Sequence, residues 1–189
     1  MTDRIWGQRL AEWIAWNHQE LEQSVRGVAP EFVLVRPTSS APSVAFHAWH
    51  VARWVDRNAM AISAWLDPSA PDEEVWVARG LTERWGLVGM ELGDFGGTGA
   101  GLDDSASAAL ALPEVDEILD YMAGAFRALE AVLARIDDDA ILERTVIDLY
   151  GDESTIGDLI LNHLSHADRH LGMIEALRGV LGERGTATV

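Results

Sequence analysis

The chain contains no cysteine and no lysine, and these two absences exclude several kinds of chemistry. Without cysteine there can be no disulfide, no thiolate zinc site and no cysteine nucleophile. All 14 basic residues are arginines, so a lysine Schiff base and the lysine of a phosphate-binding P-loop are excluded as well. The G-x-S-x-G motif of many serine hydrolases is also missing. Any metal ligands must therefore be nitrogen or oxygen atoms.

Long apolar runs and positive charge are scarce too. No uninterrupted apolar stretch approaches the roughly 18 residues of a membrane span, and the N-terminus has no charged segment followed by an apolar one. We therefore expect a cytoplasmic protein. Its net charge of −17 argues against nucleic acid and against an anionic membrane as partners, because both need a basic surface. A chain of 189 residues, 48% hydrophobic, suits one domain over residues 1–189 with one buried core.

The apolar residues recur with helical spacing in four long segments. The predicted helices cover about 6–25, 43–66, 113–136 and 155–179, and Trp6 and Trp13 belong to the apolar stripe of the first. We expect an all-α, antiparallel four-helix bundle with a long irregular connection at about 69–111 between the second and third helices. Residues 145–150 could be extended. The glycine-rich run 96–101 has neither a lysine nor an adjacent strand, so it indicates a flexible connection rather than a phosphate loop.

Five of the six histidines fall in two groups on the apolar stripes. His47 and His50 share one face of the second helix, and His163, His166 and His170 share one face of the last. A buried ring nitrogen without a partner costs about 1–3 kcal/mol, so five imidazoles in a core need an explanation. A bound metal ion provides one, and a polar histidine network or a pH-sensitive core are the alternatives.

The spacing within the last helix favours a metal site that is open on one side. His166 and His170, at i and i+4, form a bidentate pair, and either His50 or His47 could supply a third ligand from across the bundle. The remaining histidines of the two groups, such as His163, could orient ligands or bind a substrate. Imidazole suits zinc, nickel, iron and manganese, and zinc is our first choice. Three histidines with an open position are typical of catalytic sites.

Other polar and aromatic residues could border the same site. Trp49 lies between the two histidines of its helix, and Asn17 falls on the stripe of the first helix, where it could point into the cavity or bond to the backbone. His18 lies off that stripe and is interpreted as a core histidine bonded to a backbone carbonyl. Asp168 and Asn162 are predicted to be surface residues.

The compatible chemistry is metal-assisted. A bound water could become a nucleophile, as in hydrolases, or the pKa of a substrate thiol could fall on coordination. H-x-x-x-H lacks the glutamate of H-E-x-x-H, which disfavours a zincin-type protease. No general base can be identified, so the catalytic residues remain unassigned.

Two stretches resemble the DinB/YfiT-like superfamily of metal-dependent helical-bundle proteins. They are SVAFHAWHVAR (43–53) and TIGDLILNHLSHADRHLG (155–172), and the resemblance covers nearly the whole chain. It implies an antiparallel four-helix bundle in which His50, His166 and His170 bind a divalent metal. His47 and His163 are additional, and either could displace His50 or lie beside the site.

The resemblance also implies two classes of function. Some members of the superfamily are transferases or isomerases that use a low-molecular-weight thiol such as glutathione, bacillithiol or mycothiol. The leading hypothesis is therefore a metal-dependent S-transferase acting on a small-molecule substrate. The alternative is a non-catalytic protein of the stress response that binds a metal or small ligand. Family members often associate, so a homodimer is also expected.

Overall fold

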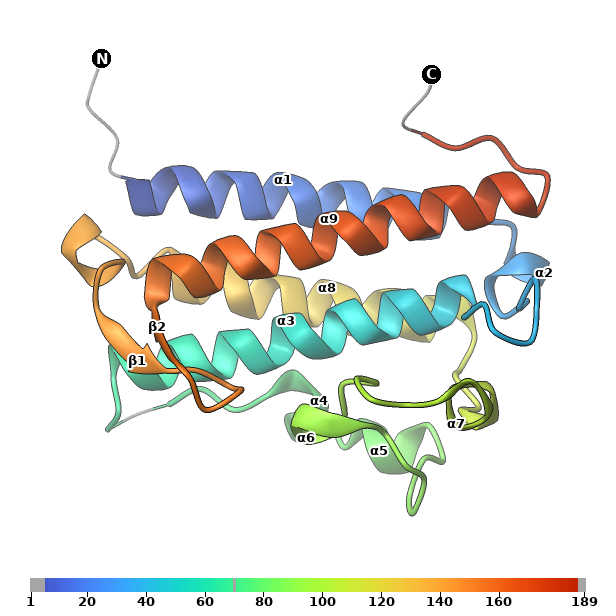
Figure 1. The fold of residues 1–189 in the computed structure, drawn as a ribbon, viewed down its shortest axis with the longest axis horizontal. Helices are drawn as coiled ribbons and strands as arrows, with labels where there is room; N and C mark the ends of the chain where they lie inside the picture. Colours follow the sequence, from blue (N-terminus) through green and yellow to red (C-terminus); the bar gives the residue numbers. More distant parts are fainter. Residues whose placement is uncertain (1–5, 70, 187–189) are drawn as a thin grey trace.

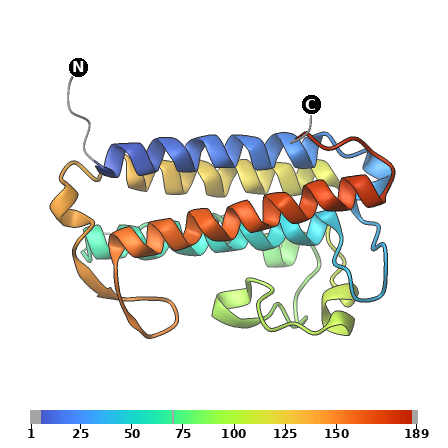
Figure 2. The ribbon, with the colours of Figure 1, turned by 45° about the horizontal axis from the view of Figure 1, so that its top comes forward.

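The computed structural model describes residues 6–69 and 71–186, and this part of the chain is mostly helical (Figure 1). Its long helices are α1 (Trp6–Arg26), α3 (Val44–Leu66), α8 (Val115–Leu133) and α9 (Ile156–Val180). They lie side by side: α1 packs against α8 and α9, and so does α3 (Figures 1 and 2). The observed bounds agree with the four predicted helices to within about two residues, except at the end of the third. That helix ends at Leu133, three residues before the predicted end.

The helix ends follow local sequence signals. Ser43 caps α3, since its hydroxyl accepts a hydrogen bond from the backbone N–H of Phe46 at 3.2 Å. Thr155 caps α9 in the same way through the N–H of Asp158, and its own hydroxyl donates to the Asp158 carboxylate. These caps fix where the two histidine-bearing helices begin.

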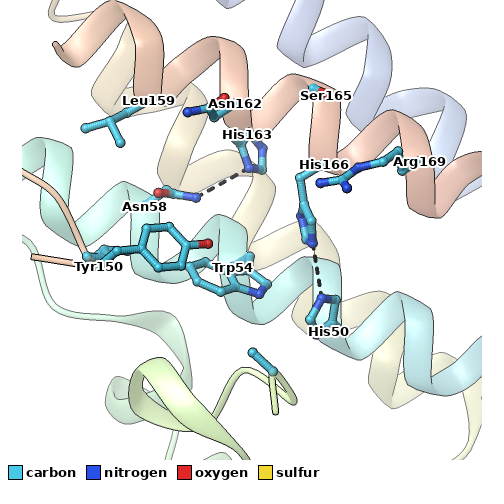
Figure 3. Close-up of a pocket in the computed structure, with 12 residues that line it drawn as sticks. His50, Trp54, Asn58, Tyr150, Leu159, Asn162, His163, Ser165, His166 and Arg169 are labelled. Atoms are coloured by element: carbon cyan, nitrogen blue, oxygen red, sulfur yellow. Dashed lines mark hydrogen bonds between the residues drawn. The ribbon is translucent and has the colours of Figure 1, made fainter. Parts of the chain in front are cut away.

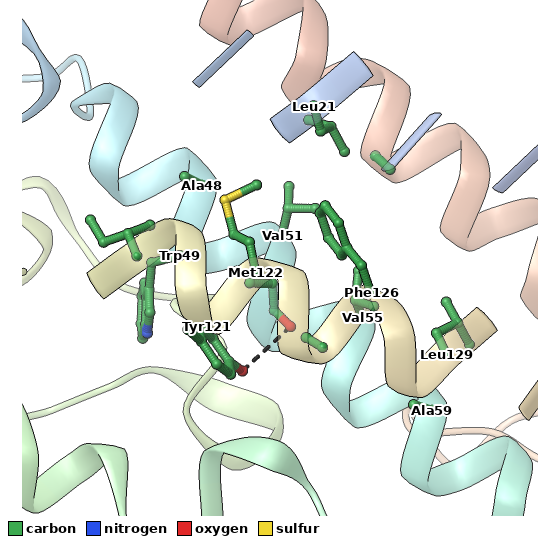
Figure 4. Packing of buried hydrophobic residues seen from close by; sticks show 14 of the residues in the cluster. Leu21, Ala48, Trp49, Val51, Val55, Ala59, Tyr121, Met122, Phe126 and Leu129 are labelled. Atoms are coloured by element: carbon green, nitrogen blue, oxygen red, sulfur yellow. Dashed lines mark hydrogen bonds between the residues drawn. The ribbon is translucent and has the colours of Figure 1, made fainter. Parts of the chain in front are cut away.

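The core lies between the long helices, with α3 and α8 in the most extensive contact (Figure 4). Val51 and Val55 of α3 pack near Met122 and Phe126 of α8, and all four are at most 3% exposed. Burying side chains of this size contributes about 1.5–3 kcal/mol each. The first part of α3 is buried on every side, because other segments also cover the face that points away from α8.

The shorter elements lie at the ends and along one side. They are α2 (Pro30–Val33), α4 (Val75–Ala78), α5 (Leu81–Arg84), α6 (Asp94–Gly97), α7 (Asp104–Ala109), the 3-10 helix η1 (Asp139–Ile141), β1 (Thr145–Ile147) and β2 (Glu153–Thr155). The two strands form an antiparallel hairpin in which Thr145 lies opposite Thr155. The extended structure expected within 145–150 is therefore confined to 145–147.

Two expectations need correction. Trp6 and Trp13 are 54% and 49% exposed, because their indoles pack edge to face against each other near the start of α1 rather than in the core. A short helical piece is expected at about 72–78, where α4 lies, but the connection 69–111 is less irregular than expected because its described part also contains α5 and α7. Within the described residues, no helix combines the length and apolar character needed to cross a membrane.

Candidate metal centre

The two histidine groups meet between α3 and α9. His50 of α3 faces His166 and His170 of α9, and the three side chains each offer a ring nitrogen within 4.8 Å of the others. The Nε2 atoms of His50 and His166 are 3.1 Å apart (Figure 3). Two nitrogens bound tetrahedrally to zinc at about 2.0–2.1 Å would be about 3.3 Å apart, so this pair already has the spacing of two ligands on one ion. The donor set fits a divalent metal that accepts imidazole.

Hydrogen bonds on the far side of the rings orient two of these histidines. Nδ1–H of His50 donates to the carbonyl oxygen of Thr98 at 2.6 Å, which leaves the lone pair on Nε2. Nδ1 of His170 lies 2.9 Å from Nδ1 of His47, so one of these nitrogens donates to the other. Such partners hold a ligand ring in one orientation and are commonly worth 10–100-fold in metal affinity.

Burial keeps the imidazoles neutral and able to bind a metal ion. It lowers the pKa of His47, His50 and His166 to about 4 each, and that of His170 to about 2. Neighbouring histidines reinforce the effect at His170, and Arg169 adds to it. At neutral pH every ring therefore has a free lone pair, which is the form that coordinates a metal.

A pocket of about 430 Å³ opens beside His50 and His166 (Figure 3). His50 and His166 form part of its wall, so an ion held there would be accessible from the pocket. Its volume lies in the range of small-molecule sites. The residues that line the pocket come from α3, from the glycine-containing stretch 94–101, from the β1–β2 hairpin and from α9. They are His50, Trp54, Asn58, Ala100, Leu149, Tyr150, Leu159, Asn162, His163, Ser165, His166 and Arg169.

The glycine segment, residues 94–101, is packed against α3 instead of forming a loose connection. A Cβ on Gly99 would lie 2.7 Å from Cζ3 of Trp49 and 3.2 Å from Nδ1 of His50. Only a residue without a side chain allows this approach, and Gly99 also has a φ of +85°. The glycines thus place the Thr98 carbonyl against His50, a role that no local pattern in the sequence indicates.

A buried arginine holds this segment in place. Arg53 is 1% exposed and donates to the carbonyl oxygens of Gly96 at 2.7 Å and Gly97 at 3.0 Å. Its charge is balanced by Asp56 and Glu74, at 3.4 and 3.0 Å. Sequence periodicity could have shown that Arg53 is buried, but not which carbonyls it binds.

The structure distributes the other candidate residues differently. His163 lines the pocket and is 5% exposed, with Nδ1 3.5 Å from the Asn58 amide. His47 supports His170, as described above. Trp49 is fully buried under Gly99 and does not line the pocket. Asn17 is also buried outside it, where its amide donates to the Asp168 carboxylate, so it neither enters the cavity nor bonds to the backbone as expected.

Two further interpretations of single residues are corrected. His18 is 2% exposed and bonds through Nδ1 to the Glu130 carboxylate at 2.8 Å, not to a backbone carbonyl, while its ring stacks on Phe126. Asn162 is exposed, as predicted, but it faces the pocket. Asp168 is exposed too, and its bond to Asn17 ties α9 to α1.

Comparisons with known proteins agree with this fold. A family model described as the DinB superfamily matches residues 14–174, which include all the histidines. Among solved structures, a conserved protein from Enterococcus faecalis is 20% identical, with a TM-score of 0.75 over 95% of this chain and 99% of that one. At this identity the likeness concerns the fold alone. None of the curated proteins compared matches the chain.

Proposed function

The chain belongs to the DinB superfamily, and from this premise we propose that it is a metal-dependent enzyme with one divalent ion held by His50, His166 and His170. Zinc is the first choice of metal, with nickel, iron or manganese as alternatives. The observation that carries the proposal is the convergence of three neutral imidazole nitrogens from two helices, with His50 and His166 in the wall of an open pocket.

We propose that the reaction is the transfer of a low-molecular-weight thiol to a small-molecule substrate. A divalent ion would lower the pKa of a coordinated thiol and so supply the nucleophile near neutral pH. The protein's own part is to orient His50 and His170, through Thr98 and His47, and to provide a pocket where a second reactant lies beside the histidines.

The same proposal covers the architecture and the partners. We infer an antiparallel four-helix bundle made of α1, α3, α8 and α9, forming one domain over residues 1–189 in a cytoplasmic protein. We also propose a homodimer, because members of this family often associate. Neither nucleic acid nor a membrane is proposed as a partner, since the net charge of −17 opposes both.

One observation keeps a non-catalytic alternative in view. Within the described part of the chain, the pocket lining contains no Asp or Glu that could act as a general base. A protein that only binds a metal or a small ligand during stress needs no such group. Thiol transfer needs none either once the thiol is ionised on the metal, and the open pocket favours the enzyme.

The first experiment measures metal content by elemental mass spectrometry on tag-free protein. We expect about one zinc, nickel or iron per chain, and its loss in the double variant His166→Ala/His170→Ala. His163→Gln is the matched control, because it removes a buried histidine of the same helix outside the ligand set, and it should keep the metal. Protein that remains metal-free after incubation with divalent ions would refute the proposal.

Catalysis is tested on the metal-loaded protein with glutathione, bacillithiol and mycothiol against a chromogenic electrophile. Turnover that disappears in the double variant supports the transferase. Full metal loading without turnover of any thiol would favour the non-catalytic alternative.

A further inference from the structure

The pocket differs in charge from the rest of the protein. The chain has 31 acidic residues against 14 arginines, yet within residues 6–69 and 71–186 no carboxylate lines the pocket. The only fully charged side chain in its lining is Arg169. Most of the surface of so acidic a chain repels anions, whereas the charge of the pocket lining favours binding an anion.

Most of the described arginines form an ion pair or a hydrogen bond with another residue, but Arg169 forms neither. Arg53, Arg79 and Arg178, for example, each form an ion pair with Asp or Glu. Arg169 is exposed and has neither an ion pair nor a hydrogen bond to any described residue. An arginine that lines a cavity with its guanidinium unpaired is suited to bind a carboxylate through two parallel N–H···O bonds.

The wall on the side of α3 and the hairpin is aromatic (Figure 3). The ring of Tyr150, in the β1–β2 turn, stacks on Trp54 of α3 with centroids 5.8 Å apart and planes inclined by 27°. Phe95 of the glycine segment supports Tyr150 from the side, at 4.7 Å. Such a wall offers a flat apolar surface to a planar ligand.

Asn58 and Asn162 add hydrogen-bonding groups without adding charge. The pocket thus combines one cation, an aromatic wall and neutral amides. One guanidinium matches one carboxylate in charge and in the geometry of two parallel N–H···O bonds.

We propose that Arg169 makes this pocket a binding site for a small organic acid, with the carboxylate on the guanidinium and a flat, unsaturated body against Trp54 and Tyr150. The inference deepens the proposed function by naming the chemical class of the second reactant. It rests on the proposed function only in assuming that a metal ion is bound beside the pocket.

The test compares three probes of similar size by isothermal titration calorimetry on zinc-loaded protein: 2-naphthoate, 2-naphthamide and decahydro-2-naphthoate. We expect 2-naphthoate to bind about tenfold or more tightly than the uncharged amide, since ten-fold corresponds to one good charge-assisted contact. The saturated acid should also bind more weakly, because it cannot lie flat on the aromatic wall.

Arg169→Gln should abolish the preference for the acid over the amide. Arg127→Gln is the matched control, since Arg127 is exposed on α8, outside the pocket, and its loss changes the net charge equally. Tyr150→Leu should remove the preference for the flat acid over the saturated one. Equal binding of acid and amide by the native protein, or a preference that survives in Arg169→Gln, would overturn the proposal.

Metal content separates this inference from the proposed function. The Arg169→Gln variant should still bind about one zinc per chain, because Arg169 contributes no ligand atom. Its charge only lowers the pKa of His166 and His170. A native protein that takes up no zinc refutes the metalloenzyme. In that case the same titrations are made on metal-free protein. A preference for the acid that disappears in Arg169→Gln still supports the role of Arg169, and a preference that persists refutes it.

Discussion

His163 lies inside the protein with its Nε2 atom buried and without a hydrogen-bond partner among the described residues. Burial is the main cause that lowers its pKa well below the ordinary value, and the nearby His18 and His166 add to the effect. The folded protein therefore keeps this ring neutral at a pH where the unfolded chain would protonate it.

This difference predicts an acid-sensitive metal-free protein. As the pH falls below about 6.5, the unfolded state binds a proton that folded His163 does not, so this ring alone lowers the free energy of unfolding by up to about 1.4 kcal/mol per pH unit. The pKa values of His47, His50, His166 and His170 are lowered too, so these rings add losses of the same sign. The sign is the same for His18, whose burial outweighs its bond to Glu130. Urea unfolding in the presence of a chelator, from pH 7.5 to 5, should show the loss, and His163→Leu should make it shallower.

Asn58→Ala is the control for that slope. It removes the neighbour of His163 Nδ1 but leaves the titrating ring, so it should lower stability while keeping the pH dependence of native protein. An unchanged slope in His163→Leu would mean that other groups carry the acid sensitivity.

At the scale of elements, the glycine segment tolerates the fewest substitutions. Gly99→Ala would place a methyl group 2.7 Å from the Trp49 ring, and Trp49 is fully buried and unable to retreat. We expect a loss of about 1–3 kcal/mol in the free energy of unfolding, by urea denaturation, and weaker zinc binding because the Thr98 carbonyl moves with the segment.

Gly89→Ala is a close control for backbone strain. Gly89 has a φ of +80°, near the +85° of Gly99, but a Cβ there meets nothing within 4 Å. Both variants share the cost of a left-handed alanine, so their difference isolates the contact with α3. Equal destabilisation in the two variants would show that the close packing of Gly99 is unimportant.

The elements differ in how far the sequence predicts them. Membership of the DinB superfamily was predicted and is confirmed. A mostly helical fold was predicted and is confirmed as well, because apolar spacing and caps such as Ser43 and Thr155 are local signals that the sequence carries directly. The three histidines also come together as expected, since the i, i+4 pair is a local feature and the resemblance supplied His50. Their binding of metal stays a prediction.

What could not be predicted depends on contacts between distant segments. Glycines carry no side-chain pattern, so nothing in 94–101 indicates that its backbone packs on Trp49 and bonds to His50. The partner of His18 is Glu130, 112 residues away, where a backbone carbonyl was the simpler assumption. Helical periodicity does not place Arg169 in a pocket either, because an exposed arginine on α9 has the pattern of an ordinary solvated helix face.

At the scale of the whole molecule, the net charge of −17 means that folding gathers mutually repelling carboxylates. Exposed ion pairs such as Arg79–Asp120 and Arg84–Glu117 offset only a little of this repulsion. We expect the melting temperature of the metal-free protein to rise by about 3 °C between 20 and 200 mM sodium chloride, roughly 1 kcal/mol for a chain of this size, as screening weakens the repulsion.

Calorimetry or circular dichroism can measure this shift, with sucrose at matched osmolality as the control for non-ionic effects. A melting temperature that falls with salt would mean that the surface ion pairs outweigh the general repulsion.

The pocket is built from two kinds of parts. The histidines belong to α3 and α9, which are long and tied into the core, whereas Tyr150 and Ala100 come from a hairpin turn and the glycine segment at the periphery. Mutations in an exposed hairpin turn are tolerated more readily than changes in core helices or in the closely packed glycine segment. Natural variation could therefore give related proteins new ligand preferences by altering the hairpin alone, while the histidine cluster is inherited intact.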